Sequence, residues 1–158
     1  MARKDITMSA AEVHEFLETH GTVQVATNGP DGRPHLAPMW YVVEDGEVVF
    51  RSFTKSQKIL NLQRDPKLTV LVEDGEAYAE LRGVMIKGTA RLETDPERVL
   101  YLYGRLAAKY AMVGDEPVEL DPEALEAAFG RFAPKNTAVT VVPEKVITWD
   151  HTKLGGGY

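Results

Sequence analysis

Sharp turn signals between short runs of strand-forming residues constrain the fold of this chain most. Residues 28–32 read Asn-Gly-Pro-Asp-Gly, and Asp-Gly pairs recur at 45–46 and 74–75. Such pairs favour tight turns with positive φ, which connect neighbouring antiparallel strands. The runs that these turns separate are predicted strands, at 22–27, 35–43, 47–51, 68–72 and 78–92. The first three are expected to form a meander, and the whole set predicts a mainly β antiparallel barrel of six or so strands.

Helix signals and strand breakers complete the expected architecture. Capping-box sequences open predicted helices at Ser9 and Thr94, the latter running to about Val113, and further helices are expected over 56–64 and after Asp121. The last strand, 137–142 and 145–149, is interrupted at 143 by a proline that marks an edge or a bulge. Glycines at 83 and 88 stand where a barrel strand bends or bulges. We therefore expect peripheral helices around one barrel.

Composition limits the classes of function. A chain of 158 residues fits one domain, 1–158, and no apolar run is long enough to cross a bilayer. The net charge of −6 argues against a nucleic-acid or anionic-membrane partner. There is no cysteine for disulfides, and the first residues lack the apolar stretch of a secretory signal, so a cytoplasmic protein is expected.

One segment carries most of the candidate chemistry. Residues 51–58 leave a predicted strand and enter a predicted helix, and they hold three hydroxyls and three cations: Arg51, Ser52, Thr54, Lys55, Ser56 and Lys58. Hydroxyls, cations and the free N–H groups of a first helical turn are together suited to bind a phosphate. The alternative is a polar surface loop, and spacing alone does not decide between the two.

The neighbouring sequence resembles the pyridoxamine-5'-phosphate-oxidase-like split β-barrels that bind flavins. The resemblance rests on Ala26-Thr27, on residues 30–35 (Pro-Asp-Gly-Arg-Pro-His) and on Pro38-Met39-Trp40. It continues through Ser52 with Ser56-Gln57-Lys58, Asn61-Leu62, Arg64-Asp65-Pro66, Tyr78, Gly83 and Gly88-Thr89-Ala90. It covers about residues 10–110 well and the rest loosely.

The resemblance implies a homodimer with the cofactor between subunits and a small-molecule substrate. It implies that the cofactor ring lies along Pro38, Met39 and Trp40, and that the phosphate is held by Arg51, Ser52, Thr54, Ser56, Gln57 and Lys58, with Asn61 in support. Gln57 replaces an arginine of the oxidases, so the chain looks closer to the deazaflavin branch, which uses coenzyme F420. A phosphodiester carries less charge than a terminal phosphate and loses less without that arginine.

The expected function is F420-dependent hydride transfer to a small electron-poor organic acceptor. FMN is the alternative cofactor, and a non-catalytic flavin, deazaflavin or haem carrier is the alternative of another class. No catalytic acid or base is evident, and His14, His20, His35 and His151 lack metal-ligand spacing, so no metal is expected.

Two further groups of residues leave alternatives open. Arg105, Lys109 and Tyr110 share a helix face that either receives an acidic cofactor tail or is solvated. In the C-terminal segment, Trp149, His151 and Tyr158 either stack on a cofactor or partner, or pack an end strand.

Overall fold

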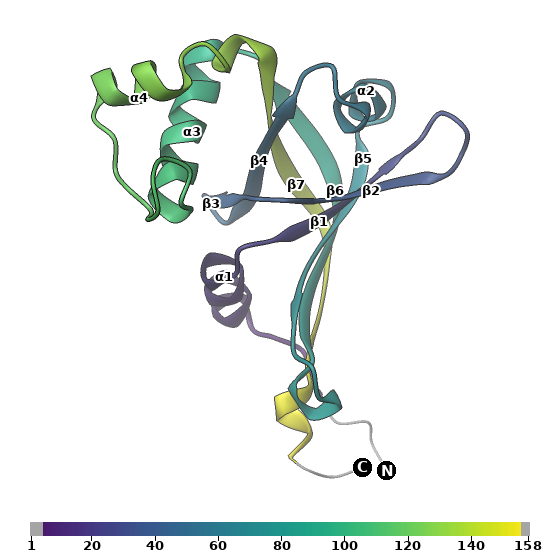
Figure 1. Ribbon diagram of the computed structural model, residues 1–158. Helices are drawn as coiled ribbons and strands as arrows, with labels where there is room; N and C mark the ends of the chain where they lie inside the picture. The colour runs from purple at the N-terminus through teal and green to yellow at the C-terminus, as the bar shows by residue number, and fades with distance from the viewer. Residues whose placement is uncertain (1–4, 156–158) are drawn as a thin grey trace.

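The computed structural model describes residues 5–155 and contains one large sheet with helices around it (Figure 1). The strands are β1 (Val23–Asn28), β2 (Pro34–Met39), β3 (Val42–Glu44), β4 (Glu47–Phe53), β5 (Lys67–Asp74), β6 (Arg82–Glu93) and β7 (Asn136–Asp150). The helices are α1 (Ala10–Thr19), α2 (Gln57–Arg64), α3 (Pro96–Lys109) and α4 (Pro122–Phe129), with 3₁₀ turns η1 (Tyr78–Glu80), η2 (Ala133–Lys135) and η3 (His151–Leu154). None of the helices described is long and apolar enough to span a membrane.

The order of the strands requires the sheet to roll up. All pairs are antiparallel, and the order β2-β1-β5-β6-β7-β4-β3 places β2 and β3 at opposite edges. In a flat sheet of seven strands these edges would be about 29 Å apart. Only Trp40 and Tyr41 separate the two strands in the chain, a link that spans at most about 11 Å. The sheet therefore curls, and the predicted mainly β split-barrel fold is confirmed.

The predicted strand 35–43 and the three-stranded meander are wrong. The strand breaks at Trp40-Tyr41, and β3 forms its hairpin with β4 at the far edge from β2. The cause lies in the backbone of Tyr41, whose N–H donates to Tyr110 Oη at 3.1 Å and whose carbonyl accepts from Tyr110 Oη at 2.8 Å and Lys109 Nζ at 3.1 Å. Side chains from the end of α3 thus take the bonds that a continuous ladder would need.

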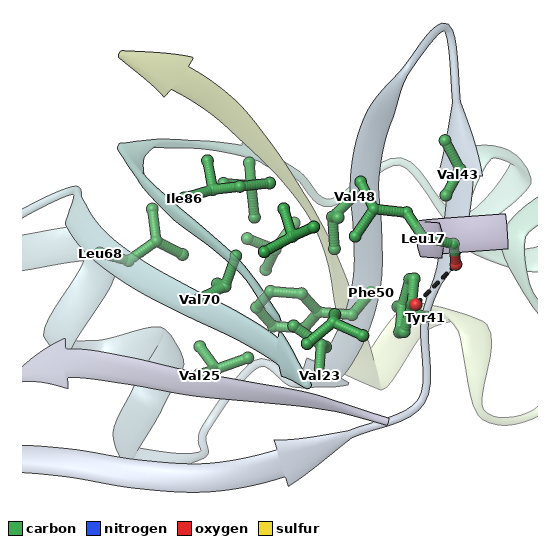
Figure 2. Close-up of a cluster of buried hydrophobic side chains, with 14 of the residues drawn as sticks. Leu17, Val23, Val25, Tyr41, Val43, Val48, Phe50, Leu68, Val70 and Ile86 are labelled. Carbon is green, nitrogen blue, oxygen red and sulfur yellow. Dashed lines mark hydrogen bonds between the residues drawn. The ribbon is translucent and has the colours of Figure 1, made fainter. Parts of the chain in front are cut away.

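The interior of the rolled sheet is a buried apolar cluster. Figure 2 shows aliphatic side chains from several strands around Phe50, with Tyr41 at one end of the cluster. The Tyr41 hydroxyl donates to the carbonyl of Leu17 at 2.6 Å, which fastens α1 to this end. A second buried cluster packs α3 against the outer face of β4. Along β4, Val48 and Phe50 face inward and Val49 faces α3.

Several expected boundaries shift. Helix α3 ends at Lys109 rather than near Val113, and its N-cap is Asp95, whose side chain accepts from the N–H of Glu97. Residues 78–80, predicted as strand, form the turn η1 before β6 begins. The N-cap role of Ser9 is confirmed by a 3.2 Å bond from the N–H of Glu12.

The two glycines of β6, Gly83 and Gly88, have different structural roles. A register shift between Lys87 and Gly88 lies opposite Pro143, which confirms the predicted bulge, and β7 runs through it unbroken. A Cβ on Gly88 would collide with the carbonyl of Val142. Gly83 lies in regular pairing, and its missing side chain makes room for the indole of Trp149.

Candidate functional site

Ser52, Ser56 and Lys58 converge where β4 passes into α2, and we call these three residues the cradle. The hydroxyl oxygens of Ser52 and Ser56 are 3.0 Å apart, and Lys58 Nζ donates to Ser52 Oγ at 3.1 Å. A turn makes this possible, because the N–H of Ser56 bonds to the carbonyl of Phe53 and starts α2 one turn from the strand end. The turn thus brings together two hydroxyls and a cation from adjacent parts of the sequence.

The cradle has positive charge without a balancing carboxylate. Lys58 is half-buried, and burial lowers the pKa of its ammonium. Within residues 5–155 it forms no ion pair, and its hydrogen-bond partner is Ser52. A desolvated cation of this kind gains from an anionic partner.

The start of α2 adds unused backbone donors. The N-cap side chains of α1, α3 and α4 each accept a backbone bond, whereas Ser56, the N-cap of α2, accepts none. Its hydroxyl is instead engaged with Ser52. First-turn N–H groups without a side-chain partner attract anions. Chemically, the cradle can hold a phosphate.

Gln57 and Asn61 form a support beside the cradle. Gln57 Nε2 donates to Asn61 Oδ1 at 2.8 Å, and Asn61 Nδ2 donates to Thr27 Oγ1 at 3.0 Å. Asn61 is fully buried, so this bond ties α2 to β1. Gln57 is exposed and supplies no charge.

Thr54 faces a different neighbour. Its hydroxyl lies 2.8 Å from that of Thr137, and its N–H bonds to the carbonyl of Lys135 at 2.9 Å. These contacts attach the turn to the start of β7, and among the described residues no hydrogen bond joins Thr54 to the cradle.

A separate open pocket lies between β2, β4 and α3, and we call it the β2–α3 pocket. Its volume is about 520 Å³, and its lining residues are Thr22, Pro38, Met39, Trp40, Arg51, Leu106 and Met112. The structure therefore gathers the three residues expected along a cofactor ring. Trp40 is half-exposed and stacks on Tyr110, with ring centroids 4.6 Å apart and planes 11° apart.

Arg51 belongs to this pocket and not to the cradle. Its guanidinium lies 4.2 Å from the ring centroid of Tyr103, and Nη1 donates to Asn136 Oδ1 at 3.1 Å. Because side chains alternate along a strand, Arg51 and Ser52 point to opposite faces of β4. Burial lowers the pKa of Arg51, and its buried Nε has no hydrogen-bond partner. A buried donor left without a partner costs about 1–3 kcal/mol.

Sequence reasoning missed the α3 side of the pocket. Lys109 donates to the carbonyl of Tyr41 in the β2–β3 link at 3.1 Å, and Arg105 donates to the carbonyl of Val43 in β3 at 3.2 Å. Both side chains thus bond to the backbone that follows β2, and neither is among the residues that line the pocket. Leu106 and Met112 line it without a polar group to mark them. For Leu106, its helical spacing from Tyr110 is the available sequence signal, whereas Met112 lies beyond the end of α3 and has none.

The remaining candidates have structural partners. His20, at the end of α1, lies between the carboxylate of Asp74 at 2.7 Å and the carbonyl of Phe16 at 2.6 Å. Trp149 packs on Gly83, and Tyr158 lies outside the described residues. Residues 5–155 contain no group of three His, Asp or Glu side chains placed to hold a metal ion.

Comparisons with known proteins agree with this architecture. The family model described as pyridoxamine 5'-phosphate oxidase matches residues 9–150. A conserved hypothetical protein from Mycobacterium tuberculosis has 37% identity and a TM-score of 0.87, over 100% of this chain and 94% of that one. No curated protein matches.

More distant solved structures share the fold. An F420 reductase has 23% identity and a TM-score of 0.64, over 85% of this chain and 94% of that chain. A haem storage protein from Vibrio cholerae has 16% identity and a TM-score of 0.65, over 88% and 93%. At these identities the similarity concerns the fold alone.

Proposed function

The chain belongs to the pyridoxamine 5'-phosphate oxidase family, and we propose that it binds the phosphate of a flavin or deazaflavin at Ser52, Ser56 and Lys58. The observation that carries this proposal is the cradle itself, with its uncompensated ammonium, two hydroxyls and uncapped helix start. A bound cofactor of this class supplies hydride transfer. The proposed activity is therefore oxidoreduction of a small electron-poor organic molecule.

Each group of the chain has a distinct part in this proposal. Lys58 and the hydroxyls hold the phosphate, while Asn61 fixes α2 against β1 so that these groups stay in place. Pro38, Met39 and Trp40 would border the ring in the β2–α3 pocket. The protein contributes binding, orientation and exclusion of water.

The charge of the cradle favours coenzyme F420 over FMN. Lys58 is the one cation with a bond inside the cradle among the described residues, since Arg51 faces the opposite side of β4. The side-chain amide of Gln57 donates to Asn61, and Gln57 contributes no second charge. One ammonium suits the single charge of a phosphodiester better than the nearly double charge of a terminal phosphate.

Parallel binding titrations test the proposal. We expect F420 to bind more tightly than FMN, as followed by quenching of cofactor fluorescence in matched buffer. If FMN binds tenfold more tightly, a difference of about 1.4 kcal/mol, the cofactor is FMN and not the deazaflavin. Haemin titrated by absorbance is the third arm, and binding of haemin in place of both cofactors would favour a carrier.

We also propose that two copies of the chain pair around the site. Large apolar side chains are exposed on β2, in the link after β2, at the end of β4 and on α2: Leu36 at 64%, Trp40 at 49%, Phe53 at 55% and Leu60 at 45%. Exposed apolar side chains on several elements near one site suit an interface between subunits. Sedimentation of apo and loaded protein measures this, and a monomer that binds cofactor stoichiometrically would contradict it.

A further inference from the structure

We propose that the β2–α3 pocket binds a planar aromatic group that bears an anionic oxygen, with Arg51 as the residue that holds that oxygen. The inference deepens the proposed function by naming the chemistry that the ring side of the site accepts. Binding to the protein without cofactor tests it separately from the cradle.

Arg51 is held in place, and part of its guanidinium has no hydrogen-bond partner. The ring of Tyr103 packs at 4.2 Å from its guanidinium, and Asn136 accepts from Nη1. The buried Nε has no partner, and Arg51 forms no ion pair within residues 5–155. A fixed, desolvated guanidinium next to a cavity is suited to a carboxylate or another anionic oxygen, because charge-assisted hydrogen bonds are strong and directional.

The remaining lining of the pocket favours an aromatic body for the ligand. Pro38, Met39, Trp40, Leu106 and Met112 provide apolar surface, and the lining residues include no Asp or Glu. The indole of Trp40 is kept in orientation by its stack on Tyr110. A volume of about 520 Å³ lies within the range of small-molecule sites. Arg51 is therefore the one charged residue in an otherwise mostly apolar lining.

Such a ligand has two sources under the proposed function. It is either the ring of the cofactor, whose carbonyl edge gains negative charge on reduction, or an aromatic carboxylate that serves as the acceptor. Both present a flat ring and an anionic oxygen to the same pocket. Cofactor-free and cofactor-loaded protein distinguish them, because a ring already in the pocket excludes an added carboxylate.

The probes are 2-naphthoate and its neutral counterpart 2-naphthamide, with affinities measured by calorimetry on the cofactor-free protein. We expect naphthoate to bind at least tenfold more tightly. The chain has two tryptophans, so the indole N–H resonances report the place of binding. The Trp40 signal should shift, while that of Trp149, which packs on Gly83 in β6, serves as an internal reference.

Variants assign the charge discrimination to Arg51. Arg51→Met should bind the two probes equally, and Arg51→Lys should keep part of the preference for naphthoate. Arg131→Met is the matched control. Arg131 is exposed, and its guanidinium also lies over an aromatic ring, 4.7 Å from the ring centroid of Phe132. Thermal unfolding of each variant checks that the fold survives, and the comparison of probes on the unaltered protein needs no variant.

The outcomes separate the alternatives. Loss of naphthoate binding on loading with cofactor identifies the cofactor ring as the natural occupant, and unchanged binding identifies an acceptor site. Equal affinities of the unaltered protein for the two probes would overturn the proposal, as would an equal loss in Arg131→Met or no binding of naphthoate. If neither F420 nor FMN binds while naphthoate still does, the proposed function fails and this inference stands.

Discussion

Arg51 and Ser52 are neighbours in β4, yet their side chains serve opposite faces of that strand. Ser52 meets Lys58 and Ser56 at the start of α2, whereas Arg51 packs over Tyr103 of α3. Two cationic sites with different surroundings thus lie on the two sides of one strand. Substitutions at Lys58 and at Arg51 should therefore have separable effects on a phosphate and on a ring.

Lys58→Ala should weaken binding of the phosphate-bearing cofactor by roughly 1.5–3 kcal/mol, the range for hydrogen bonds to charged groups. The fold should survive, since Lys58 is half-buried and its hydrogen bond is to Ser52 within the cradle. Fluorescence titration measures the affinity. Higher salt should weaken cofactor binding by the unaltered protein more than binding by the variant. Lys67→Ala, an exposed cation in β5, is the control, and an equal loss there would point to net charge instead.

Tyr110→Phe should lower the free energy of unfolding by about 1–3 kcal/mol, because it removes the hydroxyl that bonds Tyr41 and the carbonyl of Gly21. Urea denaturation measures the change. Tyr101→Phe, whose ring is exposed on the same helix, should change stability little. Equal stability of the two variants would mean that Tyr110 does not secure the link between β2 and β3.

Asn61→Ala should also cost about 1–3 kcal/mol of stability, because it leaves Thr27 without its partner inside the barrel. Gln57→Ala removes only the exposed end of this chain of bonds and should cost less. Chemical denaturation compares the two, and a larger effect at Gln57 would contradict the supporting role of Asn61.

Acid should weaken the attachment of α1 to β5 through Asp74. Burial raises the pKa of this carboxyl, but hydrogen bonds from Arg82 and His20 outweigh burial and hold the pKa below its ordinary value. A carboxyl with a lowered native pKa stabilises the folded state above its unfolded pKa, and the contribution is lost as the pH falls from about 4 through the native pKa. The urea midpoint should therefore drop more steeply in this range for the unaltered protein than for Asp74→Asn. Parallel curves for the two would exclude Asp74 as the source.

The sequence predicted those parts of the fold that depend on local signals. The Asp45-Gly46 turn, the caps at Ser9 and Asp121 and the bulge at Gly88 all lie where turn, cap and strand chemistry placed them. The break at Tyr41 could not be predicted in this way, because its cause is a pair of side chains about 70 residues further along the chain. A long-range hydrogen bond leaves no mark on the periodicity of either partner.

In the candidate site, too, contacts between residues that are near in the sequence could be predicted, and those that depend on packing could not. Ser52, Ser56 and Lys58 meet because a strand end and a helix start are adjacent in the sequence. Proximity in the chain groups Arg51 with them, but the alternation of side chains along β4 places it on the other face. That alternation was visible in the sequence, whereas Tyr103, the surface on which Arg51 rests, was not identifiable before the packing of α3 was known.

The link of Trp40 and Tyr41 makes the seam of the barrel a tether of fixed length. In the described chain β2 and β3 do not pair, so the covalent backbone joins the two edges where a closed barrel would have a hydrogen-bonded ladder. How far the edges can part is then set by the number of residues in the tether, whose reach is at most about 11 Å. Trp40 also lines the β2–α3 pocket. The short tether therefore limits how far the mouth of that pocket can widen.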